Sequence, residues 1–458
     1  MERWVSLART PFFIFTCILV LKYCGLEYFL FEDVNPLLQW KTALPSILIF
    51  TAAVEALFGN SKRKTAIYWL TDALLSAAMV SVIVYYRQFG IVVTYHALMQ
   101  AHQVVDVKDS VFSLLQPLYL LYFADLIALF AAALLRKLPR FDLKPLGRKT
   151  PGVVWTASLA AVIVYVFAYG SLLNELKQAE RMGLVGYQIH TVFTGVASAS
   201  AVAEPDVVTP DAVRTGKDID LIKTPIAFGA AKNRNLIVVQ LESIQNFVIG
   251  LEIGGQEITP VLNRLLSESY YFPNFFQSVG QGNTSDAEFV VNTGFYPPAH
   301  MAASQAYGGK ELPGMPRLLS GLGYETLTLH TNDVSFWNRV ELYPALGFNR
   351  YYDKAYFGEE DVIAFGASDE VLYAKTIPLL AELKGQGKPF YAHLIAQSSH
   401  HPFTPPETKT TIELPEEWND TLAGNYLKMA NYADRALGQF VEKLKEERLW
   451  EQSMLVVY

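Results

Sequence analysis

The chain of 458 residues is 51% hydrophobic and only 18% charged, with a mean hydropathy of +0.20. Soluble domains carry about 25% charged residues, so this composition excludes a disordered protein and argues against an ordinary soluble enzyme. Residues 1–172 carry 15 Lys and Arg against 10 Asp and Glu, whereas residues 173–458 carry 22 against 34. This asymmetry predicts a membrane part followed by a water-exposed part, and the acidic second part argues against nucleic acid as a partner.

Five apolar stretches are long enough to cross a bilayer, which takes about 20 residues. They lie near residues 11–31, 43–59, 65–86, 113–135 and 152–172. The short loops after the second and fourth stretches are rich in Lys and Arg, and the alternate loops are poor in them. Because such loops stay inside the cell, we expect a five-helix transmembrane domain over residues 1–172 in the cell membrane, with everything after it extracellular.

A connector is expected over residues 173–231, helical at first and then rich in small and polar residues. Within it, Ala201-Val202-Ala203 has the A-x-A form that a signal peptidase can cleave. Such a triplet also arises by chance in an Ala-rich linker. Cleavage after Ala203 is therefore a hypothesis that the sequence leaves open.

From residue 232 onward, short β-branched runs alternate with helical patterns. The runs predict strands at residues 235–241, 325–329, 390–396 and 454–458, and a long helix is expected over 420–449. This alternation predicts an α/β domain over residues 232–458 with a mostly parallel sheet, whose site gathers at the carboxyl ends of the strands. A buried parallel strand seldom ends a protein, so the last run is either an edge strand or evidence of a truncated sequence. We prefer the second interpretation and expect the domain to be incomplete at its C-terminus.

Two candidate catalytic groups stand out: one at the end of the first predicted strand and one at a glycine turn before a predicted helix. Glu242 follows the first strand, where its carboxylate could bind a hard divalent cation; a helix cap is the alternative, and Ser243 competes for that role. In VGQGNTSDAEF, Thr284 stands after a glycine turn at the start of a helix. Exposed N–H groups and a positive dipole end there favour a nucleophile that attacks a phosphate or sulfate ester, although an ordinary N-cap has the same sequence.

Further polar residues follow the next two strands. His330 ends the second strand, and Trp337 and Arg339 come soon after it. An arginine can hold phosphate with two hydrogen bonds, and a tryptophan can pack against glycerol or a sugar; core packing and pairing with a surface acid are the alternatives. His400 and His401 follow the third strand, and one of them can face the site from a loop. Together these positions make coincidence the weaker explanation.

The segments LESIQNF, FFQSVGQGNTSDAEF, SFWNR and HPF, together with the five spans, resemble bacterial lipoteichoic acid synthases and related phosphoglycerol transferases of the sulfatase/alkaline-phosphatase superfamily. The resemblance implies that Thr284 is the nucleophile and a metal ligand. Glu242 would be another ligand of a single Mn²⁺ or Mg²⁺. It also implies that Trp337 and Arg339 bind the glycerophosphate and that His330 and His400 line the substrate pocket.

The same resemblance implies a reaction and its partners. The donor would be phosphatidylglycerol, which releases diacylglycerol, and the acceptor would be a glycolipid or a growing lipoteichoic acid-type polymer outside the membrane. A metal-activated threonine would attack the phosphorus, and a covalent glycerophospho-threonine would divide the transfer into two displacements. These partners explain why the catalytic domain is tethered to five spans.

The sequence departs from the family at its end. The family completes its metal site with an Asp-His pair directly after a strand that matches residues 454–458, and Tyr458 is the last residue here. One alternative is therefore an inactive truncated product, and we expect this 458-residue form not to turn over. A second alternative is a related extracellular phosphoethanolamine transferase; such enzymes often have disulfides, but no cysteine follows Cys24. A third is a hydrolase of phosphate or sulfate esters, although the sulfatase patterns Cys-x-Pro-x-Arg and Ser-x-Pro-x-Arg do not occur.

Overall fold

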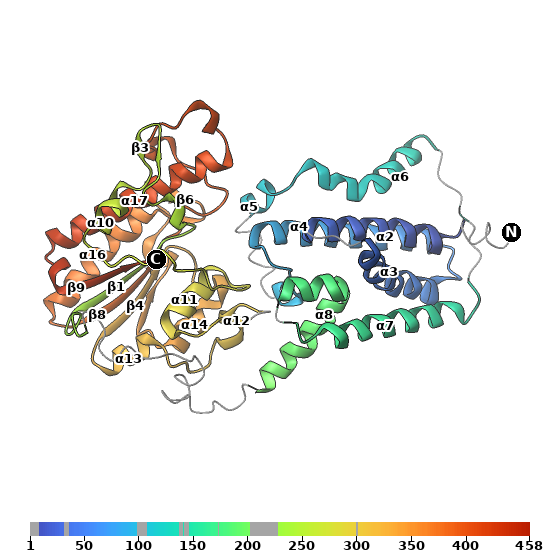
Figure 1. Ribbon diagram of the computed structural model, residues 1–458, viewed down its shortest axis with the longest axis horizontal. Coiled ribbons are helices and arrows are strands. Elements are labelled where there is room, and N and C mark those ends of the chain that lie inside the picture. The colour runs from blue at the N-terminus through green and yellow to red at the C-terminus, as the bar shows by residue number, and fades with distance from the viewer. Residues whose placement is uncertain are drawn as a thin grey trace. The chain divides into compact units, whose positions relative to one another are not determined.

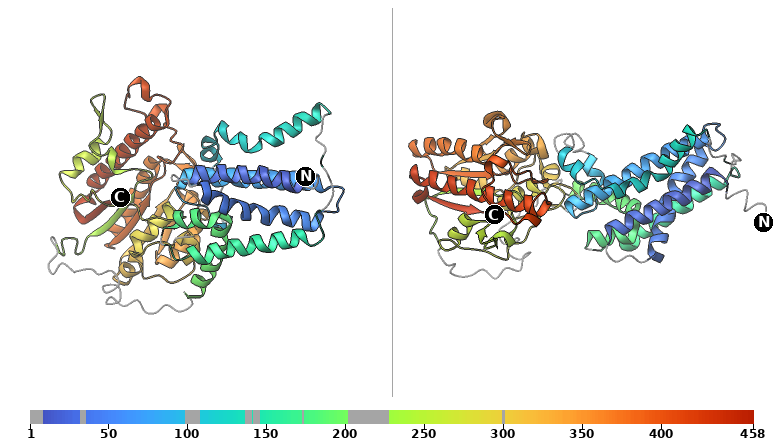
Figure 2. Two further views of the ribbon diagram at one scale, coloured as in Figure 1. Left: turned by 45° about the vertical axis from the view of Figure 1, so that its right-hand side comes forward. Right: turned by 90° about the horizontal axis from the view of Figure 1, so that it is seen from above.

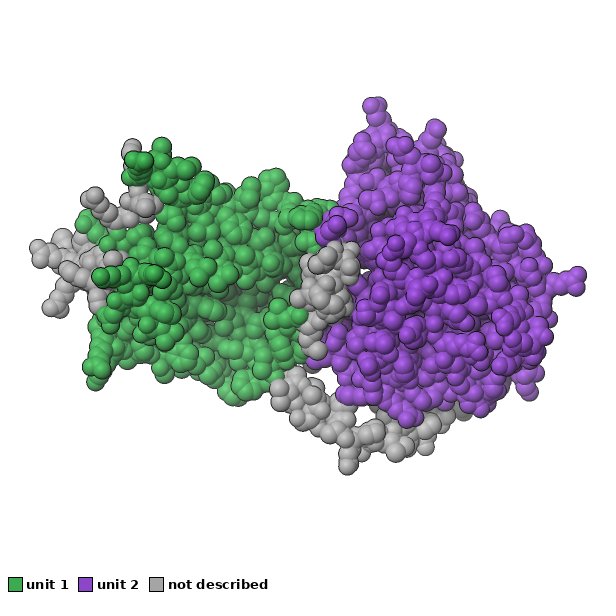
Figure 3. Space-filling model, turned by 180° about the vertical axis from the view of Figure 1, so that it is seen from behind, with its two compact units in different colours: residues 1–101, 111–204 green, residues 102–110, 205–458 purple. Residues whose placement is uncertain are grey.

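The computed structural model describes residues 9–31, 36–98, 108–136, 141, 146–172, 174–201, 228–298 and 301–458. The chain forms two compact units, residues 1–101 with 111–204 and residues 102–110 with 205–458 (Figure 3). The hypothetical cleavage point after Ala203 lies outside the described residues, as does most of the polar half of the predicted connector.

The secondary-structure elements of the first unit are all helices over its described residues (Figure 1), and α5 begins within residues 102–110 of the second unit. Its elements are α2 (Pro11–Leu30), α3 (Pro36–Phe58), α4 (Lys64–Phe89), α5 (Lys108–Ser113), η2 (Pro117–Phe123), α6 (Ala124–Leu134), α7 (Thr150–Tyr169) and α8 (Glu175–Ala201). Five segments are long and apolar enough to cross a membrane: Pro11–Leu30, Gln39–Phe58, Lys64–Phe89, Pro117–Leu134 and Thr150–Tyr169. They confirm the five predicted spans, including the second, which continues through Pro45.

Ionisable side chains inside the spans pair with one another. The ammonium of Lys22 on α2 lies 2.8 Å from a carboxylate oxygen of Asp72 on α4 and 2.9 Å from one of Asp125 on α6. Glu55 on α3 accepts a hydrogen bond from Lys64 at 3.0 Å, with both side chains buried. Because an unpaired charge is costly in hydrocarbon, these pairs bind the helices of the unit together.

The second unit is built on a five-stranded sheet with the order β5-β4-β8-β1-β9. The strands are β1 (Asn235–Gln240), β4 (Glu325–His330), β5 (Arg350–Tyr352), β8 (Phe390–Ile395) and β9 (Ser453–Val457). All four pairings are parallel, and in their register Val238 lies between His393 and Val456. The carboxyl ends of the four longer strands therefore meet at one edge of the sheet, and the predicted α/β fold with a mostly parallel sheet is confirmed.

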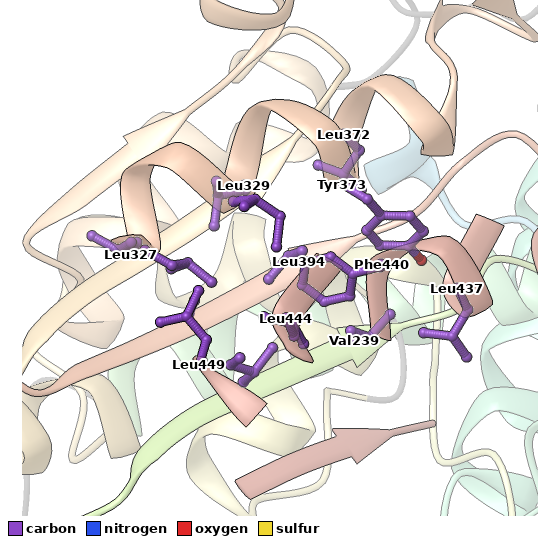
Figure 4. Packing of buried hydrophobic residues seen from close by; sticks show 14 of the residues in the cluster. Val239, Leu327, Leu329, Leu372, Tyr373, Leu394, Leu437, Phe440, Leu444 and Leu449 are labelled. Carbon is purple, nitrogen blue, oxygen red and sulfur yellow. The ribbon is translucent and has the colours of Figure 1, made fainter. Parts of the chain in front are cut away.

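Helices cover both faces of this sheet (Figures 1 and 2). One face packs against α16 (Asp369–Gly385) and α17 (Leu422–Glu446), and the other against α11 (Thr284–Thr293), α12 (Ala303–Tyr307), α13 (Met315–Gly321) and α14 (Arg339–Leu346). Figure 4 shows the first of these cores, in which Leu372, Phe440 and Leu444 lie against the strand residues Val239 and Leu394. Alternate strand residues point to the opposite face, as the pleat requires.

Short elements connect these layers. They are η3 (Asn246–Val248), β2 (Glu252–Ile253), β3 (Gln256–Glu257), α10 (Pro260–Leu266), η4 (Phe336–Asn338), α15 (Lys354–Phe357), β6 (Val362–Ile363), β7 (Gly366–Ala367), η5 (Glu407–Lys409), η6 (Glu416–Trp418) and η7 (Trp450–Gln452). The pairs β2–β3 and β6–β7 form two small antiparallel ribbons. The loops that follow β1, β4 and β8 carry the residues singled out in the sequence.

Candidate active site

The structure brings Glu242 and Thr284 together at the carboxyl end of the sheet. Glu242 lies two residues beyond β1, and Thr284 is the first residue of α11. The hydroxyl of Thr284 donates a hydrogen bond of 3.3 Å to Oε2 of Glu242, and both side chains are partly buried. The hydroxyl and the carboxylate that the sequence singles out are therefore neighbours, although 42 residues separate them.

Neither residue caps a helix in the ordinary way. The N-cap of α11 is Asn283, whose side chain makes no capping hydrogen bond, so Thr284 occupies the first helical position. The N-cap of η3, the next helix after Glu242, is Gln245. The hydroxyl of Ser243 donates to Oε1 of Glu242 at 3.1 Å instead. The capping alternatives that the sequence left open are thus not what the structure contains.

A buried aspartate organises the glycine turn in front of Thr284. The carboxylate of Asp286 accepts hydrogen bonds from the backbone N–H groups of Gly280 and Gly282, both at 2.9 Å, and of Ala303 at 2.7 Å. Burial raises the pKa of Asp286, and these N–H groups oppose that rise. A Cβ atom at Gly282 would lie 2.4 Å from Oδ1 of Asp286, so the turn requires glycine there.

The backbone just before Thr284 is held in an unfavourable conformation. Asn283 has φ 40° and ψ −106°, in the half of the map that residues with a side chain rarely adopt. Such positions cost on the order of 1–3 kcal/mol and persist only where the surroundings fix them. Here the Asp286 carboxylate fixes the turn, and the side-chain amide of Gln240 donates to the Thr284 carbonyl at 3.2 Å.

His330 is a buried neutral histidine beside this site. Its Nδ1–H donates to the carbonyl of Ile395 on β8 at 2.9 Å, so Nε2 carries the lone pair. Burial, followed by the positive charge of Arg339, lowers the pKa of His330 well below its ordinary value. Nε2 of the neutral ring is therefore a hydrogen-bond acceptor at neutral pH, and substrate binding by His330 stays a prediction.

Aromatic contacts join the loop after β4 to the loop after β8. The ring of Trp337 lies 5.9 Å from that of Phe336, which stacks on Phe365 at 6.1 Å. Phe365 in turn meets the ring of His400 edge-on at 4.7 Å. Trp337 is only partly buried, so it is not simply a core residue. This aromatic row connects two of the predicted substrate-binding residues.

The two adjacent histidines lie in different surroundings. Nδ1 of His400 is 2.6 Å from the carbonyl oxygen of His401, to which it donates, so the Nε2 of His400 carries the lone pair. Burial lowers the pKa of His401. The preference for His400 over His401 as the pocket residue stays a prediction.

Arg339 is fully enclosed and its guanidinium is already paired. Its Nη2 and Nε lie 2.6 and 2.9 Å from Oε1 of Glu288 on α11, and both side chains are 1% exposed. A third bond runs from Nη1 to the carbonyl of Phe336 at 3.3 Å. Arg339 thus pairs with a buried acid, Glu288, and not with a surface acid. Phosphate binding by Arg339 stays a prediction, with the added requirement that it act from within this pair.

The oxygen donors of Glu242 and Thr284 fit a hard divalent cation. Mg²⁺ takes about six oxygen ligands, and carboxylates are the commonest from proteins. Across the described residues, no group of three or more His, Cys, Asp or Glu side chains is placed to hold a metal ion. The roles of Glu242 and Thr284 as metal ligands therefore stay a prediction, and two oxygen donors alone would not complete such a set.

Sequence reasoning missed several buried residues around the site. Gln240 and Asp286 hold the peptide and the turn at Thr284, and Glu288 holds Arg339. His393 lies in the centre of β8 and is completely buried. The available signal was a polar residue at the end of the apolar run NLIVVQL and another inside FYAHLIA.

Two family models match the chain. The lipoteichoic acid synthase N-terminal domain matches residues 1–184, and the sulfatase family matches residues 234–458. Lipoteichoic acid synthase 2 of Bacillus subtilis is 31% identical over 442 residues, which cover 93% of this chain and 67% of that protein. The chain belongs to the lipoteichoic acid synthase family.

Other members of the lipoteichoic acid synthase family match as well. The enzyme of Staphylococcus aureus strain USA300 is 30% identical over 431 residues, 90% of this chain and 66% of its own length. The crystal structure of the lipoteichoic acid synthase LtaP from Listeria monocytogenes superposes with a TM-score of 0.53 at 47% identity, covering 54% of this chain and 60% of that one. The chain spans about two thirds of the length of the curated relatives it matches.

Proposed function

We propose that this protein is a membrane-anchored phosphoglycerol transferase that moves glycerophosphate from phosphatidylglycerol to a lipoteichoic acid-type polymer. The observation that carries the proposal is the Thr284–Glu242 contact at the N-terminus of α11, in a chain of the lipoteichoic acid synthase family with five apolar helices. A hydroxyl beside a carboxylate, in a turn held by backbone hydrogen bonds, suits attack on a phosphodiester.

Each residue of the site has a task in this proposal. The Thr284 oxygen attacks the phosphorus of the lipid head group, the bond from phosphorus to the diacylglycerol oxygen breaks, and diacylglycerol leaves as the alcohol with the proton that Thr284 gives up. A hydroxyl of the acceptor then attacks the phosphorus of the glycerophospho-threonine, which frees Thr284 and returns its proton. The N–H groups at the start of α11 stabilise the negative charge that develops on the phosphate. Trp337 packs against the glycerol, and Arg339 provides positive charge, while Nε2 of His330 and of His400 accept hydrogen bonds from glycerol hydroxyls.

Mn²⁺ or Mg²⁺ is the proposed cofactor, with Glu242 and Thr284 as two of its ligands. When bound, such an ion lowers the pKa of a coordinated hydroxyl and neutralises charge on the phosphate. The Glu242 carboxylate, oriented by the Ser243 hydroxyl at 3.1 Å, is placed to hold the ion against the Thr284 oxygen. Glu242 and Thr284, which contact each other directly in this structure, would then both be ligands of the same ion.

Orientation and partners complete the proposal. The Lys- and Arg-rich loops favour a cytoplasmic side opposite the catalytic unit, which is then extracellular. The donor is a lipid in the same membrane, and the acceptor is a glycolipid or the growing polymer. Tethering to five spans keeps the catalytic unit at the surface where both substrates are found.

The experiment that tests the function follows a fluorescent phosphatidylglycerol in membrane vesicles from cells that express the complete reading frame containing this chain, with Mn²⁺ added. We expect fluorescent diacylglycerol and a glycerophosphate polymer, and their complete loss in Thr284→Ala. Thr293→Ala is the matched control, because Thr293 ends the same helix and its hydroxyl bonds only local backbone, donating to the Phe289 carbonyl at 2.7 Å and accepting from the Phe295 N–H at 3.1 Å.

The products separate the alternatives. Free glycerol phosphate without polymer would identify a hydrolase instead of a transferase. Release of diacylglycerol by Thr284→Ala at the rate of the unaltered protein would contradict the assignment of the nucleophile.

A further inference from the structure

A row of polar groups runs through the sheet beneath Thr284 and has no part in the proposed chemistry; Asn292, His393 and Gln240 are buried, and Tyr458 is partly buried. It begins at Asn292 on α11, crosses His393 on β8, Tyr458 beyond β9 and Gln240 at the end of β1, and returns to the carbonyl of Thr284 at the start of α11. The row therefore connects two residues of the same helix through three strands.

The hydrogen bonds of this row can run in one direction only. The Asn292 amide nitrogen donates to the Glu288 carbonyl at 2.7 Å and to Nδ1 of His393 at 3.2 Å, and its oxygen accepts from the Tyr391 hydroxyl at 2.7 Å. Nδ1 of His393 is thus an acceptor, and in the neutral ring the proton is on Nε2.

The remaining links follow from that proton. Nε2–H of His393 donates to the Tyr458 hydroxyl at 3.2 Å, and Tyr458 donates to Oε1 of Gln240. The amide nitrogen of Gln240 is then left to donate to the Thr284 carbonyl at 3.2 Å. The direction of each hydrogen bond is set by the one before it, so removing one bond leaves the next side chain free to change its orientation.

Burial keeps the row in this state. His393 is 0% exposed, and burial together with the charge of Arg339 lowers its pKa to about 3, so the ring is neutral across the physiological range. The backbone of Tyr458 bonds the two neighbours of Gln240 in the chain. Its N–H donates to the Val239 carbonyl at 3.0 Å, and its carbonyl accepts from the Leu241 N–H at 2.8 Å, so Tyr458 is held beside Gln240.

We propose that His393, Tyr458 and Gln240 are positioning residues that hold the first turn of α11, and with it the Thr284 hydroxyl, against the carboxyl end of the sheet. The Thr284 carbonyl is the end of the row nearest the reacting oxygen, and the strained Asn283 stands directly before it. The importance of this role for catalysis rests on the proposed function of Thr284 as the nucleophile.

The first test is hydrogen–deuterium exchange of the full chain in detergent, followed by mass spectrometry. Tyr458→Phe removes one hydroxyl and keeps the ring. We expect the segment 280–288 to exchange at least about 3-fold faster than in the unaltered protein, because the amides of Ser285 and Ala287 belong to this first turn. The segment 430–441 of α17 should keep its rate, which excludes general unfolding.

Tyr373→Phe is the matched control. Its hydroxyl is also buried, in the opposite core, and has no hydrogen-bond partner among the described residues. It should leave the exchange of segment 280–288 unchanged. Unchanged exchange of that segment in Tyr458→Phe would overturn the proposal whether or not the protein turns over.

The second test is kinetic and uses diacylglycerol release by the complete reading frame. Tyr458→Phe should lower kcat about 10-fold to 100-fold and leave KM unchanged, since a small displacement of the nucleophile slows the chemical step. Gln240→Met should do the same, and the double variant should be no slower than Gln240→Met alone. Effects that multiply in the double variant, or a change confined to KM, would overturn positioning by a connected row.

The two tests fail independently of each other. If the unaltered protein releases no diacylglycerol, the proposed function fails, and the exchange of segment 280–288 still decides whether the row holds α11.

Discussion

Arg339 and Glu288 form an ion pair that water does not reach, with each side chain 1% exposed. Burying two charges is costly, and the cost is repaid only while both partners are present. Burial lowers the pKa values of His330 and His393, and the positive charge of Arg339 lowers them further. A single substitution therefore acts on stability and on the protonation of the site together.

Replacing Arg339 should show how much the buried ion pair contributes to the free energy of unfolding. We expect Arg339→Met to lower the free energy of unfolding by about 3–5 kcal/mol, because it leaves the Glu288 carboxylate buried and unpaired. Urea unfolding followed by tryptophan fluorescence measures the change. Lys443→Met, which breaks an exposed pair with Glu446, should have little effect. Equal effects of the two variants would contradict the buried pair as a source of stability.

The buried histidines predict a loss of stability in acid. The pKa of His393 is about 3 in the folded protein and about 6.5 when unfolded. Below about pH 6.5 the unfolded chain binds a proton that the folded chain does not, so stability falls as the pH drops towards 3, by at most about 1.4 kcal/mol per pH unit. Urea unfolding at pH 7 and pH 5 should show a smaller loss in His393→Gln than in the unaltered protein, and an equal loss would refute this account.

At the scale of elements, the start of α11 depends on a glycine that no other residue can replace. A Cβ atom at Gly282 would stand 2.4 Å from the Asp286 carboxylate and 2.8 Å from the Ser285 hydroxyl. The carboxylate cannot move away without releasing the backbone N–H groups that it holds. The geometry of the Thr284 hydroxyl is thus set by the turn as much as by the helix.

Gly282→Ala should therefore abolish diacylglycerol release and speed hydrogen exchange at the start of α11. The physical reason is the clash with Asp286, which leaves buried N–H groups without an acceptor at about 1–3 kcal/mol each. Gly321→Ala is the control, because a Cβ at Gly321 in α13 meets no atom within 4 Å. It should be neutral or slightly stabilising, and full activity in Gly282→Ala would show that the turn tolerates a side chain.

The sequence predicts most strands of the sheet but only some residues of the site. Apolar or β-branched runs locate β1, β4 and β8, because burial on both faces leaves a continuous signal. The run MLVVY locates β9 as well, although this strand stands at the end of the sheet order and is only partly buried. The helix α16 is not among the predictions, and Pro378 inside it is a residue that usually ends helices. Glu242 and Thr284 could be singled out because each follows a local signal. His393 could not, because its partners Asn292 and Tyr458 lie on other elements that only the fold brings near. Asp286 could not, because an acid in the first turn of a helix is ordinary and nothing in the sequence shows that it is buried and holds the turn at Gly280 and Gly282.

At the scale of the whole molecule, the sequence joins a basic, membrane-spanning unit to an acidic α/β unit. The described residues of the first unit contain five helices long enough to cross a bilayer. An odd number of spans puts the two ends of the helical set on opposite sides of the membrane. The side that holds the α/β unit is predicted from the loops alone, since Lys62 and Arg63 stand between the second and third spans and Lys64 begins the third.

This orientation can be tested with single cysteines in a Cys17→Ser/Cys24→Ser background. We expect a membrane-impermeant maleimide to label Glu417→Cys in the α/β unit of intact cells, once the cell wall is removed. Lys62→Cys, in the basic loop, should react only after the membrane is permeabilised, because a positively charged loop stays on the cytoplasmic side. Both positions are exposed, so access to the reagent is decided by the membrane and not by burial. The reverse pattern would place the Thr284 hydroxyl in the cytoplasm, on the wrong side to extend an extracellular polymer, and the transferase proposal would then lose its acceptor.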